Sequence, residues 1–401
     1  MALGCSVLAA GRAGAQTPVP PQTEAAAYTR YELLTPGSAR FRIVYEVTAT
    51  TAGATSYFNP IRKGSIATDE QVSDRSTGER LQFDVVGHAI ARAGGVRGGD
   101  SAQQYIRVKL ARPVPPNGGQ ARLLIEKTYE DPLSYFAEGS TITFRRSLGI
   151  KRNAVVLPPG FELLSCNFPS QVLQEPDGRV AVSFWNATPA EAPLLLRARR
   201  APALGAKPSS AAARLDERAH QNREIVYFLL QPETHAFDLY HDYTESRAGT
   251  STYLNLVRPG STVAKPSARN LDTGEELVHE VLKGDAVVRA KLDLPNLTPQ
   301  SEVVVFRFAP VKAGTSVRLR MFETYTDSAR YALVNDELVW DRSFGRPANA
   351  VVLPTGWILT NSSIPASISE LPDGRLRLDF INPRPDEIGV LITARRRTPR
   401  P

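Results

Sequence analysis

The same residues recur along this chain at one fixed spacing. Ala154–Pro158 reads Ala-Val-Val-Leu-Pro and Ala350–Pro354 repeats it, so the offset is 350 − 154 = 196 residues. The same offset links further matching residues: Tyr31 with Tyr227, Phe41 with Phe237, Asn59 with Asn255, Thr77–Glu79 with Thr273–Glu275, and Asp177–Arg179 with Asp373–Arg375. A spacing that persists over so much of the sequence indicates an internal duplication, and it restricts the fold to two copies of one module.

The repeat divides the chain into two predicted domains. A length of 401 residues suits two domains better than one. We place repeat 1 at residues 28–200 and repeat 2 at residues 224–397. Residues 201–223 form the predicted linker, in which Ala, Arg and Glu between Ser209 and Gln221 favour one short helix.

Within each copy the apolar residues alternate with polar ones. Phe41, Ile43, Tyr45 and Val47 alternate with Arg42, Val44 and Glu46, and Leu376, Leu378 and Phe380 alternate with charged residues in the second copy. This period of two predicts strands with one buried and one solvated face. Turn signals such as Pro176-Asp177-Gly178 separate the strands. The fold class expected is all-β, with two tandem antiparallel β-sandwich domains; a barrel is the alternative architecture.

The first residues have the character of an export signal. Ala2–Ala10 is small and apolar, and Ala13-Gly14-Ala15 before Gln16 has the small-x-small form of a cleavage site. We therefore expect a signal segment at 1–16 and a Pro-rich spacer at 17–27, hence a periplasmic or extracellular bacterial protein. A lipid anchor at Cys5 and the absence of any leader are the less favoured alternatives. The sequence has no apolar run of transmembrane length, so we predict no transmembrane span.

Charge and cysteine content argue against several classes of function. The net charge of +7 comes from arginines spread over both repeats rather than from one basic stripe, so we expect no nucleic-acid partner. The two cysteines are Cys5, in the expected leader, and Cys166, whose counterpart at the 196-residue offset is Ser362. This distribution gives neither a disulfide within a domain nor a thiolate metal site.

The familiar catalytic motifs are missing from the sequence. His279-Glu280 resembles the start of a zinc-protease helix, but Lys283 stands where the second histidine belongs. The five histidines form no metal-binding pair at helical spacing, and no Gly-x-Ser-x-Gly motif occurs. We therefore expect no metal and no cofactor, and we favour a protein that is not an enzyme.

Polar residues kept in both copies are the candidate site residues. They are Tyr129, Asp131, Arg146 and Asn153 in the first copy, and Tyr325, Asp327, Arg342 and Asn349 in the second. Such side chains make directional hydrogen bonds, so one hypothesis is a polar pocket for a sugar or a peptide. The favoured interpretation is architectural: Asp131 and Arg146 pair to hold two loops together, and the asparagines satisfy backbone groups at strand ends.

The order of segments in residues 123–170 resembles a known type of domain. It contains Tyr129 and Asp131, then Phe144–Gly149, then Val155-Val156-Leu157-Pro158, and finally Phe168-Pro169; residues 319–365 repeat it. This resembles sandwich domains of exported bacterial proteins, and it is faintly similar to the N-terminal sandwich domain of M1-type metallopeptidases. The chain lacks the catalytic helix motif of those peptidases, so the resemblance implies a fold and no peptidase activity.

These features lead to two hypotheses about function. The first is a non-catalytic exported binding or structural protein of the bacterial cell envelope, with a protein or glycan as partner. Tandem sandwiches favour it because they offer an inter-domain groove and edge strands. The alternative is a hydrolase-type enzyme whose site lies between the repeats and uses Asp131, Arg146, Asp327 and Arg342.

Overall fold

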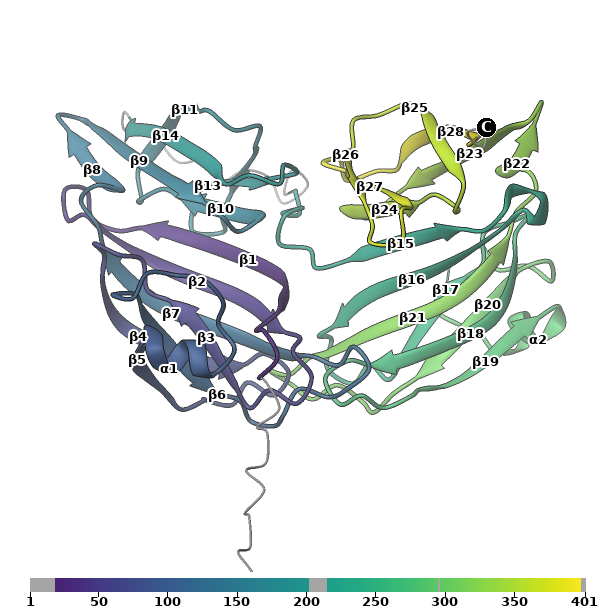
Figure 1. The fold of residues 1–401 in the computed structure, drawn as a ribbon, viewed down its shortest axis with the longest axis horizontal. Helices are drawn as coiled ribbons and strands as arrows, with labels where there is room; N and C mark the ends of the chain where they lie inside the picture. Colours follow the sequence, from purple (N-terminus) through teal and green to yellow (C-terminus); the bar gives the residue numbers. More distant parts are fainter. Residues whose placement is uncertain (1–18, 202–214, 295, 398–401) are drawn as a thin grey trace, which may run out of the picture.

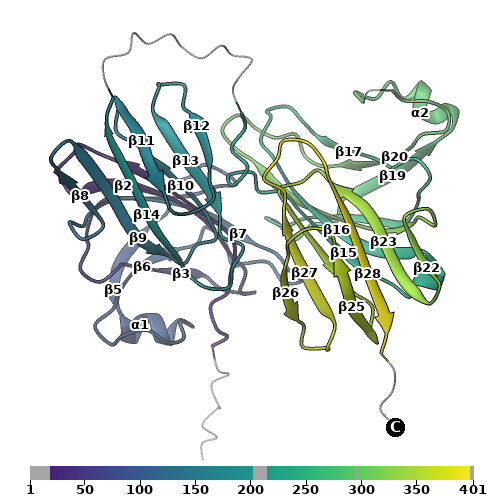
Figure 2. The same ribbon diagram turned by 90° about the horizontal axis from the view of Figure 1, so that it is seen from above.

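The computed structural model describes residues 19–201, 215–294 and 296–397. The described chain forms two all-β halves that lie next to each other (Figures 1 and 2), as the alternating sequence predicts. The expected signal segment at 1–16 and Cys5 lie outside the described residues. No helix in the described ranges is long and apolar enough to cross a membrane.

Each half is built on a seven-stranded sheet. In the first half the strand order is β12 (Gln171–Gln174), β13 (Val180–Trp185), β10 (Arg152–Val156), β1 (Glu24–Leu33), β2 (Arg40–Ala49), β7 (Ala121–Glu130) and β4 (Ile66–Asp74). In the second half it is β26 (Ser367–Glu370), β27 (Leu376–Ile381), β24 (Ala348–Val352), β15 (Glu224–Leu229), β16 (Ala236–Glu245), β21 (Val317–Thr326) and β18 (Thr262–Asn270). Matched through the offset of 196, the two orders are the same.

Two smaller sheets complete each half. Those of the first half are β11 (Phe161–Cys166), β14 (Ala192–Arg200), β9 (Thr141–Leu148) and β8 (Tyr135–Glu138), and β3 (Ser56–Pro60), β6 (Gln104–Lys109) and β5 (Phe83–Gly87). Those of the second half are β25 (Trp357–Ser362), β28 (Ile388–Arg396), β23 (Glu337–Phe344) and β22 (Tyr331–Val334), and β17 (Thr252–Leu256), β20 (Glu302–Arg307) and β19 (Val278–Lys283). The short helices are α1 (His88–Ala93), α2 (Asp285–Arg289) and the 3₁₀ turn η2 (Pro232–Thr234).

One pair of strands in each large sheet is parallel. β1 runs parallel to β10, with Tyr31 beside Val155, and β15 runs parallel to β24, with Tyr227 beside Val351. The other strand pairs between the described residues are antiparallel. Parallel neighbours need a long crossover, and here more than a hundred residues separate β1 from β10 along the chain. Alternation of apolar residues reports only local geometry, so it does not reveal this pairing.

The inner face of each large sheet packs on both smaller sheets. In the first half Phe41 and Ile43 of β2 belong to the same buried cluster as Phe144 of β9 and Val108 of β6. The second half has an equivalent cluster that contains Phe237, Phe344 and Trp340. Each half therefore has its own sandwich core, in which the second layer is divided between two sheets.

Two boundaries differ from the expectation. Strand β1 begins at Glu24, so the end of the expected spacer at 17–27 is paired to β2. The described part of the expected linker, 215–223, contains a turn at Arg218–His220 and no helix; 202–214 lies outside the described residues. The turn at Arg218–His220 contacts both halves. From the first half Arg152 donates to the Ala219 carbonyl over 3.2 Å, and Arg218 donates to the Gly345 carbonyl of the second half over 3.1 Å.

The two halves contact each other through backbone hydrogen bonds from equivalent donors. The Gln120 N–H donates to the Leu271 carbonyl over 2.8 Å, and the Ser316 N–H donates to the Ser76 carbonyl over 3.1 Å. The donors are counterparts, since 120 + 196 = 316, and the acceptors differ by one position, because Leu271 corresponds to Arg75, the residue before Ser76. Equivalent surfaces therefore meet, as in a two-fold symmetric dimer, although one chain supplies both.

Candidate functional site

The predicted pair Asp131–Arg146 is a buried link between the loop after β7 and strand β9. Arg146 Nη1 lies 3.1 Å from Asp131 Oδ2, and both side chains are 7% exposed. The Ser134 hydroxyl donates to the same carboxylate over 2.7 Å, and the Arg146 guanidinium lies over the ring of Phe41. Burial opposes ionisation of Asp131, but the hydrogen bonds from Ser134 and the charge of Arg146 outweigh it and hold the pKa of this carboxyl below its usual value.

The second half repeats this arrangement. Arg342 Nη1 lies 2.9 Å from Asp327 Oδ2, and the Ser261 hydroxyl donates to that carboxylate over 2.9 Å, just as Ser65 donates to Asp131. A site that serves one ligand has no reason to be buried and paired identically in both copies. The contacts therefore favour the architectural interpretation of these four residues.

The other four predicted residues also make local contacts. Asn153 Nδ2 donates to the Ile150 carbonyl over 2.6 Å, and Asn349 Nδ2 donates to the Arg346 carbonyl over 2.8 Å, so each closes a turn before a strand. The Tyr129 hydroxyl accepts from the Arg62 N–H, and the Tyr325 hydroxyl accepts from Asn255. The eight residues stay in two separate groups, one in each half, and none lines the pocket between the halves.

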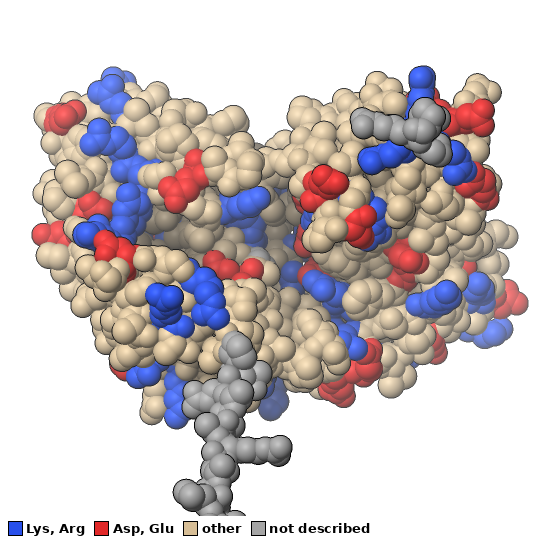
Figure 3. Space-filling view, in the orientation of Figure 1, with Lys and Arg blue, Asp and Glu red and all other residues tan. Residues whose placement is uncertain are grey.

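That pocket has a volume of about 600 Å³ and lies where equivalent segments of the two halves face each other. Its walls come from equivalent segments: Pro169 and Pro365, Ser170 and Ala366, Gln171 and Ser367, Ser183 and Asp379, Trp185 and Ile381, and Ala187 and Pro383. Figure 2 shows that these segments, β12–β13 and β26–β27, lie toward the centre of the molecule. In Figure 3 a notch separates the two halves at the top.

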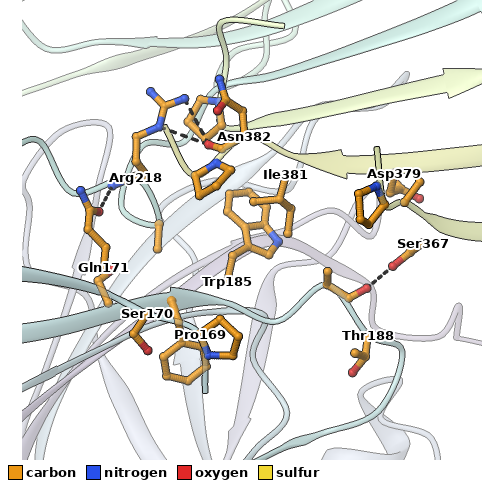
Figure 4. A pocket seen from close by; sticks show the side chains of 18 residues that line it. Pro169, Ser170, Gln171, Trp185, Thr188, Arg218, Ser367, Asp379, Ile381 and Asn382 are labelled. Atoms are coloured by element: carbon orange, nitrogen blue, oxygen red, sulfur yellow. Dashed lines mark hydrogen bonds between the residues drawn. The ribbon is translucent and has the colours of Figure 1, made fainter. Parts of the chain in front are cut away.

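Polar contacts fix the shape of this pocket (Figure 4). Arg218 of the linker donates through Nε and Nη2 to the Asn382 carbonyl, over 3.3 Å each, and its own N–H donates to Gln171 Oε1 over 3.0 Å. At the other side the Ser367 hydroxyl donates to the Ala187 carbonyl. The linker and both halves thus hold the pocket open in one preformed shape.

The lining of the pocket is mainly apolar. The apolar lining residues include Trp185, Ile381 and four prolines, and the lining includes no histidine, cysteine or lysine. Its one carboxylate, Asp379, is engaged by Arg377 over 2.7 Å. Among the lining serines, Ser183 has a carboxylate beside it: its buried hydroxyl donates to Glu217 over 2.8 Å, and the Tyr28 hydroxyl donates to the same oxygen over 2.8 Å. Apolar walls with a few fixed polar groups are typical of ligand pockets.

Sequence reasoning did not single out these lining residues. Pro169 and Pro365 match at the offset of 196, but in one sequence they look like ordinary loop prolines. Trp185 directly follows Phe184 and so breaks the alternation of Val180, Val182 and Phe184 in β13. This break, and the position of Trp185 at the end of its strand next to a polar loop, were the signals available in the first half. Its counterpart Ile381 carries no comparable signal.

Each half also buries a titratable group beside an equivalent asparagine. In the first half Lys127 Nζ donates to Asn59 Oδ1 over 2.7 Å. In the second half Asn255 Nδ2 donates to both carboxylate oxygens of Glu323, over 2.8 and 2.7 Å. Lys127 and Glu323 are each 5% exposed, and both occupy inward positions of apolar strands. The sequence did contain a signal for these two residues. Lys127 continues the inward series of Leu123 and Ile125, and Glu323 continues that of Leu319 and Met321, so each puts a charge at a position where an apolar residue is expected.

Replacing Glu323 by glutamine is expected to stabilise the protein at alkaline pH. Burial raises the pKa of Glu323 from 4.5 to about 7. A carboxyl whose pKa is raised on folding stabilises the native state while protonated, and this stability is lost as pH rises through 7. At pH 8 we expect Glu323→Gln to be more stable by about 1–3 kcal/mol in urea unfolding, and at pH 5 the difference should nearly vanish. The exposed Glu370→Gln serves as the control; a pH-independent difference would contradict the assignment.

Comparison with known proteins gives a faint likeness of fold. No protein-family model and no curated protein matches the sequence. Solved structures similar to part of the chain include an M1 zinc metallopeptidase from Deinococcus radiodurans (13% identity, TM-score 0.30, 45% of this chain and 42% of that one). A second is a putative nutrient-binding protein from Legionella pneumophila (8% identity, TM-score 0.29, covering 45% of this chain and 68% of that one). A third is an aminopeptidase N family protein from Idiomarina loihiensis (9% identity, TM-score 0.27, covering 43% of this chain and 29% of that one). The chain thus spans less than half the length of the metallopeptidase, and the faint similarity to M1 metallopeptidases is one of fold alone.

Proposed function

We propose that this chain is a non-catalytic binding protein of the bacterial cell envelope, which holds an apolar segment of a protein partner in the pocket between its halves. The observation that carries the proposal is the preformed pocket of about 600 Å³, whose walls of Trp185, Ile381 and prolines come from equivalent segments of both halves. Export is supported by the small apolar residues at 2–10 and the Ala13-Gly14-Ala15 pattern.

A peptide fits this place because two edge strands flank the pocket. β12 and β26 are the last strands of the two large sheets, and each is paired on one side only among the described strands. An extended peptide can pair with such an edge while its apolar side chains enter the neighbouring pocket. The exposed Val172 and Ile368 on these edges add apolar surface next to the pocket.

Replacing Trp185 by alanine is expected to weaken binding of such a peptide strongly. Peptides selected from a random display library on the full chain should be rich in apolar residues, because the walls of the pocket are apolar. Loss of the indole should cost about 2 kcal/mol, which raises Kd roughly 30-fold. The measurement is fluorescence anisotropy of the selected peptide with Trp185→Ala.

The matched control is Leu133→Ala, which removes an exposed apolar side chain far from the pocket. Its affinity should equal that of the unmodified protein. The proposal is wrong if no peptide is enriched, or if the selected peptides bind Trp185→Ala as tightly as the unmodified chain while the variant melts at the same temperature.

A further inference from the structure

A second pocket lies inside the first half, and Lys127 is part of its wall. This pocket has a volume of about 300 Å³ and is lined by residues of β1, β2, β3, β7 and β9. Its lining includes the buried Tyr45, Tyr57 and Lys127 as well as the exposed Arg62 and Glu191, so it reaches the surface. It shares no residue with the pocket between the halves.

The amine of Lys127 is held by a neutral partner. Nζ donates to Asn59 Oδ1 over 2.7 Å and lies 5.0 Å from the ring centroid of Tyr129. Among the described residues no carboxylate lies within ion-pair distance of Nζ: Glu24 accepts from the Tyr57 hydroxyl, and Asp131 is taken by Arg146. A buried ammonium without a counter-ion is unfavourable, so the neutral amine is stabilised.

The surroundings of this amine act in the same direction. The ionisable groups around Lys127 come from every element packed against it: Glu24 and Tyr31 on β1, Tyr45 on β2, Tyr57 on β3, Arg62 after β3, Glu70 on β4, Tyr129 on β7, Arg146 on β9 and Glu191 before β14. Burial, and then the positive charge of Arg146, lower the pKa of Lys127 to about 7, while Glu70 opposes them weakly. A lysine that is desolvated beside another cation is a nucleophile at neutral pH.

The second half shows that the fold does not require a lysine here. Glu323 takes the equivalent position, and Asn255 turns its amide nitrogen toward that carboxylate where Asn59 presents its oxygen to Lys127. The two copies keep the asparagine and reverse the charge beside it. The buried amine is therefore a feature of the first half alone and is not needed for the shared fold.

We propose that Lys127 is the nucleophile of a site that binds a small aldehyde or ketone covalently. The lone pair of Nζ attacks the carbonyl carbon, and a proton moves from nitrogen to oxygen to give a carbinolamine. Loss of that hydroxyl group together with the remaining N–H proton releases one water and leaves an imine between Nζ and the ligand. No oxidant or reductant is consumed, and the step reverses by addition of water. The volume of about 300 Å³ restricts the ligand to a small molecule.

Reductive alkylation of the whole chain tests this inference. Acetaldehyde with cyanoborohydride traps each imine as an ethyl group, and peptide mass spectrometry gives the rate at each of the nine lysines in one sample. At pH 7 the neutral fraction of Lys127 is roughly a thousand times that of an ordinary lysine with a pKa of 10.4. The lower basicity of the Lys127 amine and its buried position both slow its reaction with acetaldehyde. Even so, we expect Lys127 to react at least ~10-fold faster than the exposed Lys63 and Lys109. At pH 10 this advantage should disappear.

Asn59→Asp identifies the cause of the reactivity. The new carboxylate is nearly isosteric and pairs with the ammonium, so the selective labelling at pH 7 should fall ~10-fold or more. Asn255→Asp makes the same change at the equivalent position of the second half and should leave labelling of Lys127 unchanged. If Lys127 in the unmodified protein reacts no faster than Lys63 at pH 7, the inference is wrong. Because this result does not involve Trp185 or peptide binding, its failure would leave the proposed function standing.

Discussion

Replacing Arg146 by alanine is expected to destabilise the protein by about 3 kcal/mol or more. Removing one partner of a buried ion pair leaves the other charge buried without compensation, which typically costs 3–5 kcal/mol. Asp131 keeps its hydrogen bonds from Ser134 and Ser65, so the lower end of this range applies. Arg342→Ala should have the same effect in the second half, because Asp327 is equally buried and paired. Guanidinium unfolding at pH 7 measures both changes.

The neighbouring Arg145→Ala is the matched control for the first half. Arg145 lies on the same strand with its side chain exposed, so its loss should change the free energy of unfolding by less than about 0.5 kcal/mol. Asp131→Ala combined with Arg146→Ala should cost less than the sum of the single changes, since neither charge is then left alone. If Arg146→Ala and Arg342→Ala both unfold like the unmodified protein, these pairs do not hold the loops and the architectural interpretation fails.

Much of the local structure was predictable because it depends on neighbouring residues. Phe41, Ile43, Tyr45 and Val47 alternate in the sequence, and all four are buried on β2. Pro176-Asp177-Gly178 predicts a turn, and Gly178 adopts the positive φ of 85° that such a turn requires of glycine. The equal strand order of the two halves agrees with the offset of 196.

What depends on distant contacts could not be predicted in this way. Val180, Val182 and Phe184 indicate a strand with one wet face, yet Ser183 on the other face is also buried, because Glu217 of the linker accepts from its hydroxyl over 2.8 Å. The pocket between the halves exists only because Trp185 and Ile381 are brought together by the docking of two separate cores. Alternation and turn signals carry no information about that docking.

The contact between the halves depends most on Arg122 and Asp272. Arg122 Nε lies 2.6 Å from Asp272 Oδ1, and Nη2 lies 2.8 Å from Oδ2, so the pair is bidentate and buried, with side chains 7% and 4% exposed. Arg122 also donates to the Ser316 carbonyl over 3.0 Å, and Asp272 accepts from the Arg318 N–H over 2.8 Å. In the sequence Asp272 is a turn residue, and its counterpart is Ser76. This ion pair therefore belongs to the docked arrangement rather than to the repeated module.

Asp272→Ala is accordingly expected to lower the free energy of unfolding by about 3–5 kcal/mol and to make the two halves unfold separately. Each half has its own core, so once the link is lost the two should unfold at different denaturant concentrations. In a Trp185→Phe background the remaining tryptophans, Trp340 and Trp357, report on the second half, while circular dichroism reports on both. The two signals should coincide with Asp272 in place and diverge in Asp272→Ala.

The control is Arg107→Ala, which removes a bidentate pair of similar geometry from the surface. Arg107 Nε donates to Asp84 Oδ1 over 2.8 Å, but the two side chains are 40% and 52% exposed. Solvent screens exposed pairs, which add little to stability, so this variant should keep coincident transitions and nearly the same midpoint. Coincident transitions at an unchanged midpoint in Asp272→Ala would instead mean that the halves are held by the linker contacts of Glu217 and Arg218. Because the same docking forms the pocket at Trp185, Asp272→Ala should also lower the affinity of the selected peptides without removing any residue that lines it.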